Sequence, residues 1–264
     1  MYLALSLVAC LSLIPFVWLV AATFKSSGDI FSYTFFAPLS RLTLGNYKDL
    51  VTTEPFLRYV INSVFVSCAG VVVQLFFSSL AGYALAKYQF PGKKAFYLLM
   101  LASLMIPGQV TLAPSYELLY RMHLVDTFAG LLIPGAVSVF GIFLFDRALQ
   151  QVPDELIQAA RIDGCNEFRI YYEIVMPMVR PMIGAFCLIS FMGMWNSFLW
   201  PTVLLHSKEH FTLPIGLSQM VTLYSSQYGM LMAGTLLSIV PVVALFFVLQ
   251  KEFIAGLTSG AVKG

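Results

Sequence analysis

A pair of histidines, four cysteines and one cluster of charges are the side chains of this sequence that could do chemistry. His206 and His210 have the i, i+4 spacing of a metal-binding pair. Nothing around them predicts a helix and no third ligand is near, so we expect an ordinary loop there and no metal site. The cysteines lack the CxxC spacing of zinc and redox sites and are expected to be small packing residues: Cys10, Cys68, Cys165 and Cys187.

The charged cluster occupies residues 152–177, VPDELIQAARIDGCNEFRIYYEIVMP. It contains seven charges: Asp154, Glu155, Arg161, Asp163, Glu167, Arg169 and Glu173. Each charge at the centre of a bilayer costs roughly 2.5–3.5 kcal/mol, so a membrane-spanning placement would cost on the order of 20 kcal/mol. This segment is therefore expected outside the lipid.

Local signals in 152–177 predict two short helices joined by a glycine elbow. Pro153 suits the first helical position, and Gly164 can take the left-handed conformation at the helix end. Asn166 can cap a second helix. The first helix is expected to expose a small apolar knob suited to a partner's groove, formed by Leu156, Ile157, Ala159 and Ala160. The alternative is an amphipathic linker on the membrane surface.

The rest of the chain predicts an integral membrane protein. Of 264 residues, 59% are hydrophobic and 11% charged, whereas a soluble domain is about 25% charged. Six apolar spans without Asp, Glu, Lys, Arg or His are expected, at residues 3–24, 59–86, 95–116, 127–145, 181–205 and 230–250. Their length favours helices over barrel strands, so we expect an all-α polytopic fold with six transmembrane helices in one domain, 1–264. The first span is interpreted as a retained helix and not as a signal peptide.

Basic residues predict the orientation. An even number of spans places both termini on one side of the membrane. The short loop KYQFPGKK carries Lys87, Lys93 and Lys94, and short loops obey the positive-inside rule most strongly. Both termini and residues 152–177 are therefore expected in the cytoplasm.

Several classes of function are disfavoured. The sequence contains neither GxSxG nor HExxH, so an intramembrane enzyme is not expected. Uncharged spans argue against a proton-coupled transporter, and the net charge of +2 without a basic run gives no sign of nucleic-acid binding. A GxxxxGK[ST] phosphate loop is also absent. A transporter of this kind would have to receive energy from a partner, and 152–177 is the candidate docking element.

The run QAARIDG, followed ten residues later by IVMP, resembles the EAA loop of binding-protein-dependent ABC importers. Six residues match that pattern: Ala159, Ala160, Asp163, Gly164, Ile174 and Pro177. Gln158 replaces the Glu of the motif and Met176 its Leu. The resemblance implies a type I importer permease fold and a coupling loop that docks an ATPase through Leu156, Ile157, Gln158, Ala159, Ala160, Asp163 and Gly164. ATP-Mg would be used by that ATPase, with no cofactor in this chain.

Similarity covers essentially the whole chain and is closest to the carbohydrate-uptake branch, in particular the second permease of maltose and glycerol-phosphate systems. It is carried by TFK, LGNYKDL, YALAKYQFPGKK, WNSFLWP and FIAGLTSGAVKG. The resemblance implies a second permease, two ATPase copies and an extracytoplasmic solute-binding protein as partners, in a bacterial or archaeal cytoplasmic (inner) membrane. Alternatives are a permease for polyamine, phosphate or another small solute, and a membrane scaffold that transports nothing.

Aromatic and amide side chains near the outer end of the fifth span are candidates for a translocation path. At 1.5 Å per residue from Arg180, Trp200 would lie about 30 Å along the helix, at the outer interface. Trp195 and Asn196 would lie about one turn deeper, and the candidates for the path are Trp195, Asn196 and Ser197. The alternative is an interfacial aromatic belt with an amide that bonds a neighbouring helix, and Gln74 and Gln109 have the same ambiguity. The loop 206–229 would touch the binding protein or cap the interface.

Overall fold

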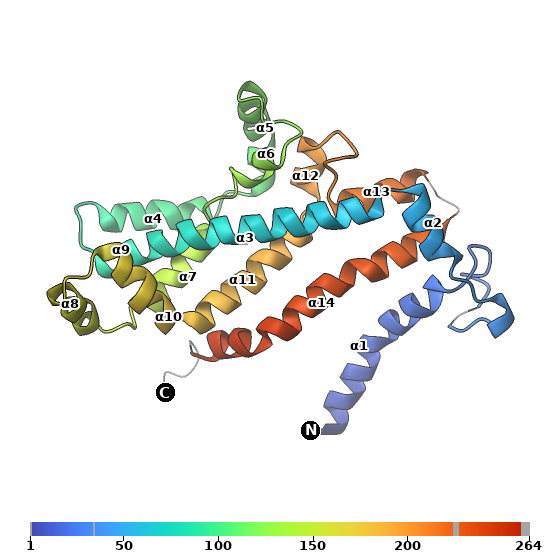
Figure 1. Ribbon diagram of the computed structural model, residues 1–264, viewed down its shortest axis with the longest axis horizontal. Coiled ribbons are helices and arrows are strands. Elements are labelled where there is room, and N and C mark those ends of the chain that lie inside the picture. Colours follow the sequence, from blue (N-terminus) through green and yellow to red (C-terminus); the bar gives the residue numbers. More distant parts are fainter. Residues whose placement is uncertain (1, 34, 224–226, 260–264) are drawn as a thin grey trace. The chain divides into compact units, whose positions relative to one another are not determined.

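The computed structural model describes residues 2–33, 35–223 and 227–259. Within these ranges every regular element is a helix, and the one β-bridge joins Lys25 to Leu42. Contacts divide the chain into two compact units, residues 1–63 with 207–244 and residues 64–206 with 245–264. Helices α3 (Phe56–Lys87) and α14 (Tyr228–Ser259) each belong partly to both units (Figure 1). The all-α prediction is confirmed, whereas the single domain 1–264 stays a prediction.

The first unit is held together by buried side-chain amides. It contains the beginning of α3, most of α14, and α1 (Tyr2–Thr23), η1 (Leu39–Arg41), α2 (Gly45–Thr53) and α13 (Leu213–Leu223). The Asn46 amide donates to the carbonyls of Thr23 and Lys25 at 2.7 and 2.8 Å. The Asn62 amide donates to the carbonyls of Glu209 and Phe211 at 2.8 and 2.9 Å. These bonds satisfy backbone carbonyls at the end of α1 and in the loop before α13, where buried backbone groups need such partners.

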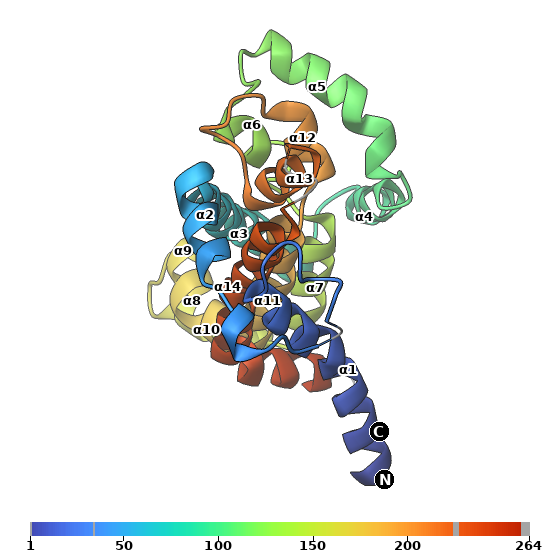
Figure 2. The ribbon, with the colours of Figure 1, turned by 90° about the vertical axis from the view of Figure 1, so that its right-hand side faces the viewer.

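The second unit carries the charged segment at one end and a group of short helices at the other (Figures 1 and 2). The short helices are α5 (Leu112–Arg121), α6 (Phe128–Leu132) and α12 (Leu199–Leu204), and the charged segment contains α8 (Asp154–Ile162), α9 (Glu167–Arg169), η3 (Ile170–Val175) and α10 (Met176–Met178). Between the ends lie the rest of α3, α4 (Lys93–Ser103), η2 (Gly108–Thr111), α7 (Val139–Leu149) and α11 (Arg180–Trp195).

Three of the predicted spans are continuous helices, and three are broken. Helices α1, α3 and α14 match spans 3–24, 59–86 and 230–250 and are long and apolar enough to cross a membrane. Span 95–116 instead bends by 91° between α4 and η2–α5. Span 127–145 is interrupted between α6 and α7, and span 181–205 between α11 and α12. In these three spans the predicted transmembrane helix is therefore divided into shorter helices.

Prolines account for two of these breaks, because Pro107 precedes η2 and Pro134 lies between α6 and α7. A second bend of 85° joins the charged segment to α11. The described residues give three candidate spans, or up to five if each bent pair is counted as one span. The six-helix count is compatible with this arrangement and stays a prediction.

A close contact between α3 and α7 should be sensitive to a single methyl group. A Cβ on Gly82 would lie 2.6 Å from the Cβ of Phe145 and 3.0 Å from the backbone nitrogen of Asp146. We expect Gly82→Ala to destabilise the protein by about 1–3 kcal/mol because one helix must move away from the other. The measurement is the thermal unfolding midpoint of the purified chain in detergent.

Gly193→Ala in α11 is the matched control, since nothing lies within 4 Å of an added Cβ there. Alanine is the better helix former by about 1 kcal/mol, so this variant should unfold at an equal or higher temperature. Equal midpoints for the Gly82 variant and the native chain would contradict the close contact.

Candidate functional site

The two-helix elbow predicted at 152–177 is present. Helix α8 ends at Ile162 with Asp163 as its C-cap, and Gly164 follows with a φ of 82°, the left-handed conformation expected at the turn. The amide of Cys165 donates back to the carbonyl of Ala160 at 3.0 Å. Pro153 is the N-cap residue of α8, with a φ of −62° and a ψ of 133°, and not the first helical residue as predicted.

The second arm of the elbow differs from the predicted regular helix. Asn166 caps it as expected, its side-chain oxygen accepting the amide of Arg169 at 2.8 Å. After three residues of α9 the chain forms the π-helix η3 and then the short α10, which contains Pro177. Proline has no N–H to donate to the carbonyl of Glu173, four residues earlier, which disfavours regular α-helix here.

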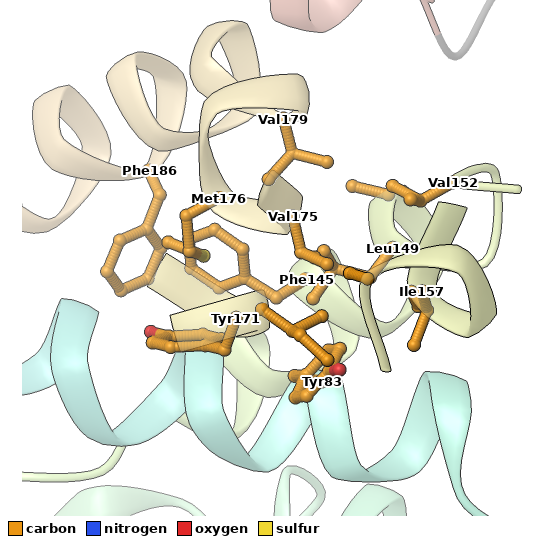
Figure 3. Close-up of a cluster of buried hydrophobic side chains, with 13 residues drawn as sticks. Tyr83, Phe145, Leu149, Val152, Ile157, Tyr171, Val175, Met176, Val179 and Phe186 are labelled. Carbon is orange, nitrogen blue, oxygen red and sulfur yellow. The ribbon is translucent and has the colours of Figure 1, made fainter. Parts of the chain in front are cut away.

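The apolar knob of α8 is divided between two faces. Ile157 and Ala160 are only 3% and 6% exposed and pack into the protein's own core. Figure 3 shows Ile157 pointing into a buried cluster with Leu149 and Val175. The prediction that all four apolar residues of the knob are exposed was wrong for these two, because α3, α7 and η3 cover that side of the helix.

The outward face of the elbow is larger than the sequence suggested. Leu156, Gln158, Ala159, Asp163 and Gly164 are exposed on α8 and its turn, as expected for a docking surface. Ile162 is also 87% exposed, and Phe168 and Tyr172 on the second arm are 59% and 68% exposed. Sequence reasoning missed these three, although the i, i+4 spacing of Phe168 and Tyr172 among charges was a usable signal.

A carboxylate clamp joins the two arms to the loop after α3. The guanidinium of Arg161 donates to both carboxylate oxygens of Glu167, at 2.7 and 3.1 Å, and the hydroxyl of Tyr88 donates to the same carboxylate. These hydrogen bonds, from Arg161 first and Tyr88 second, lower the pKa of Glu167. Burial raises the pKa of Tyr88, with a further contribution from Glu167.

The segment YALAKYQFPGKK, which predicted orientation through its lysines, also holds the elbow. The ammonium group of Lys87 pairs with the carboxylate of Asp154 at 2.6 Å and donates to the carbonyl of Val152. The ring of Tyr83 packs against the ring of Tyr171 in the π-helix, with centroids 5.6 Å apart. This fixing role was not predicted, because contacts between distant segments leave no local pattern in the sequence.

The three candidate path residues lie in different surroundings. Trp195 is buried and stacks on Phe191, with ring centroids 5.6 Å apart and 15° between the planes. Asn196 is exposed and its amide donates to the carbonyl of Met192 in its own helix at 2.9 Å. Ser197 lines a cavity of about 470 Å³ together with Trp200 and Gln109. Trp200 belongs to α12, so the estimate of its depth along one continuous helix was wrong.

That cavity, here called the outer cavity because it lies at the end predicted to face outward, is formed where the three broken spans meet. Its walls come from η2 and α5, from α6 and the break after it, and from the beginning of α12. The lining residues are uncharged: Gly108, Gln109, Thr111, Leu112, Ser115, Leu131, Pro134, Gly135, Ser197, Phe198, Leu199 and Trp200. Hydroxyl and amide groups beside two aromatic rings can hydrogen-bond and stack against a neutral polar solute. They supply no acid–base pair for catalysis.

The other candidates give no additional site. The described residues contain no group of three metal-ligating side chains around the histidines or elsewhere. All four cysteines are free. Helix α13 occupies much of loop 206–229, and residues 224–226 of that loop lie outside the described ranges.

Gln74 in α3 donates to the carbonyl of Gly135 at 2.7 Å, and this bond joins α3 to the break after α6. The tail that contributed to the resemblance is described as far as Ser259.

The fold is that of an importer permease. It matches a chain of the crystal structure of a bacterial ABC transporter involved in the import of the acidic polysaccharide alginate, with a TM-score of 0.85, 23% identity and coverage of 96% of this chain and 94% of that chain. A family model described as "Binding-protein-dependent transport system inner membrane component" matches residues 74–255. The chain belongs to this family of membrane permeases.

Two curated relatives are similar over nearly the full chain. The arabinooligosaccharides transport system permease protein AraQ of Halalkalibacterium halodurans is 40% identical over 97% of this chain and 93% of its own length. The lactose transport system permease protein LacG of Rhizobium radiobacter is 33% identical over 99% and 95%. The resemblance drawn from the EAA-like segment is confirmed at the level of the family.

The clamp on Glu167 makes the elbow sensitive to acid. A carboxyl whose pKa is lowered by folding stabilises the folded state fully above its ordinary pKa of 4.5, and this contribution is lost as the pH falls through the lowered value. We therefore expect the protection factors of residues 154–169, which correct for the pH dependence of intrinsic exchange, to fall at acidic pH. Glu167→Gln should show the faster exchange already at pH 7.

Glu173→Gln is the control for this experiment. Glu173 pairs with Arg169 within one arm, at 2.8 Å between exposed side chains, and does not bridge the elbow. Its exchange should match the native chain at pH 7. Equal exchange in the Glu167 and Glu173 variants would show that the clamp does not hold the two arms together.

Proposed function

We propose that this chain is one permease subunit of an ATP-driven importer and forms, with a second homologous permease, the path of a sugar or sugar derivative across the cytoplasmic membrane. The observation that carries the proposal is the uncharged outer cavity in a chain whose full-length relatives are named for oligosaccharide and lactose transport. Family membership supplies the transport role, and the cavity favours the class of solute.

The lining of the outer cavity matches the chemistry of a neutral sugar. Sugar hydroxyls both donate and accept hydrogen bonds, as the amide of Gln109 and the hydroxyls of Thr111, Ser115 and Ser197 can. The ring of Trp200 offers a flat apolar surface for the C–H face of a sugar ring. A polyamine would need carboxylates and a phosphate would need cations, and neither lines this cavity.

Energy would enter at the outward face of the elbow. The sequence has no phosphate loop of its own, so ATP-Mg would be bound and hydrolysed by two copies of a separate ATPase. Leu156, Ala159 and Ile162 offer apolar contacts to such a partner. Gln158 is exposed beside them and can form a neutral hydrogen bond where the related motif has an acid.

The inward face of the elbow would transmit the motion. Ile157 and Ala160 are buried in the same cluster as Phe145 of α7 and Phe186 of α11. A densely packed cluster moves as a unit, so a displacement of α8 would pull on both helices. Rocking of two such permeases against each other could then open the path to either side in turn.

The remaining partner would be an extracytoplasmic solute-binding protein. The family description names binding-protein dependence and the inner membrane, and a second solved relative, with a TM-score of 0.66 and 14% identity, is a bacterial alginate ABC transporter in complex with an alginate pentasaccharide-bound periplasmic protein. We place both termini and the elbow in the cytoplasm from the lysine-rich loop, and loop 206–229 outside, where it would touch this partner.

A substitution on each face of α8 separates docking from folding. Ile162→Asp puts a charge on a side chain that is 87% exposed, so the chain should accumulate normally while ATPase association and ATP-dependent uptake fall about tenfold or more. Ile157→Asp buries a charge and should lower the amount of folded chain instead. The assay is copurification of the ATPase, followed by uptake of labelled sugar into vesicles that contain all subunits.

Two further variants complete the elbow experiment. Gly164→Val forces an L side chain into the left-handed region and should uncouple uptake from ATP hydrolysis. Gln158→Glu should leave assembly and uptake close to native values if the partner's groove accepts either side chain. Partner binding without uptake by the native chain would support a scaffold in place of a permease.

The outer cavity can be tested independently of the elbow. Ser197→Trp should fill part of the cavity and reduce sugar uptake severalfold, with ATPase association unchanged. Asn196→Leu is the neighbouring control, because Asn196 is exposed and bonds its own helix. Equal uptake by the native chain and the Ser197 variant would remove the cavity from the path.

A further inference from the structure

Arg147, near the end of α7, lies in the wall between two cavities of the second unit. The first cavity, of about 540 Å³, runs along α7 and α11, and its apolar side chains include Phe140, Phe143, Leu144, Met182, Ala185 and Ile189. We call it the apolar groove. The second, of about 510 Å³, is lined by Lys93, Lys94, Tyr97, Asp146 and Gln150, among others. We call it the basic bowl.

The guanidinium of Arg147 is held in place and is still accessible. It donates to the hydroxyl of Tyr97 at 2.9 Å and lies 5.3 Å from the ring centroid of Phe143. A weaker contact joins it to the side-chain oxygen of Gln150 at 3.5 Å. Its side chain is 54% exposed, and a guanidinium has five N–H donors. Some of these donors are therefore left for a ligand.

The bowl has a surplus of positive charge. Asp146 is buried beside Arg147, with 3.8 Å between its carboxylate and the guanidinium, and accepts the amide of Gln150 at 3.0 Å. Its negative charge offsets one of the three positive charges of the bowl, which belong to Lys93, Lys94 and Arg147. Lys93 and Lys94 occupy the first turn of α4, where the helix dipole is also positive and no acidic residue compensates it. Ammonium groups at this end of a helix are unfavourable unless an anion is near.

We propose that a phospholipid with an anionic headgroup binds at this pair of cavities, its acyl chain in the apolar groove and its phosphate in the basic bowl. A soluble anion would leave the apolar groove empty, and a lipid without net charge would leave the lysines uncompensated. Arg147 lines both cavities, so the positive charge and the apolar groove form one continuous surface. A lipid has both an anionic headgroup and an acyl chain, and can therefore occupy the two cavities at once.

This lipid would act on the elbow. The apolar groove is also lined by Val152, Met178 and Val179, which lie at the two ends of the elbow. Val152 and Val179 belong to the buried cluster that receives Ile157 (Figure 3). An acyl chain in the groove therefore extends the packing that fixes the elbow to α7 and α11.

The test is lipid binding by the full chain, purified in a mild detergent and examined by native mass spectrometry. The probes are phosphatidylglycerol and phosphatidylcholine with identical acyl chains. We expect one phosphatidylglycerol to bind about tenfold or more tightly than phosphatidylcholine. Combined Lys93→Gln, Lys94→Gln and Arg147→Gln should remove the preference, and Ile189→Trp in the groove should weaken both lipids.

The matched control neutralises three exposed cations that line neither cavity, by Lys48→Gln, Arg58→Gln and Lys251→Gln, and should keep the preference. Equal affinity of the native chain for both lipids would overturn the proposal, even if a variant failed to fold. Full competition by soluble glycerol phosphate would also overturn it, because that result describes an anion site without an acyl chain. If the control variant with three substitutions also lost the preference, the preference would come from general surface charge and not from these cavities.

Discussion

The hydrocarbon of a membrane tolerates neither free charges nor unpaired backbone groups, and this constraint determines where this protein can be polar. Acidic and basic side chains are absent from the six predicted spans and lie in the elbow, the lysine-rich loop, the connecting segments and the parts of helices beyond the spans. The long helices α1, α3 and α14 satisfy their backbones internally. Every irregular stretch must then find other partners, as the break after α6 does through the amide of Gln74.

One face of the elbow is packed into the protein, and the other face is exposed. Ile157 and Ala160 are fixed by apolar packing, while a salt bridge and two hydrogen-bonding tyrosines fix the flanking backbone. Exposed ion pairs contribute little stability on their own. Their value here is geometric, because they orient two short arms that could not hold an angle by helix propensity alone.

Local signals in the sequence predicted much of this fold, and contacts between distant segments account for most of what it missed. The turn at Gly164 and the cap at Asn166 depend on neighbouring residues, and both were predicted correctly. Which face of α8 is buried depends on α3 and α7, so the inward direction of Ile157 could not be predicted from its own helix. Prolines marked two of the broken spans, yet the size of a bend is decided by packing. Of the path candidates, Ser197 lines the outer cavity, whereas Trp195 is buried against Phe191.

The π-helix at Ile170–Val175 affects the direction in which the side chains after it point. Its i→i+5 bonds accommodate one more residue per turn than an α-helix would. A regular α-helix of the same number of residues would place every later residue about 100° further round the axis. Phe186 would then no longer face Phe145, with which it now packs at 5.3 Å between ring centroids. The wide turn therefore holds its additional residue while Phe186 still faces Phe145, and a relative with one residue fewer between Gly164 and α11 should form a regular α-helical turn here.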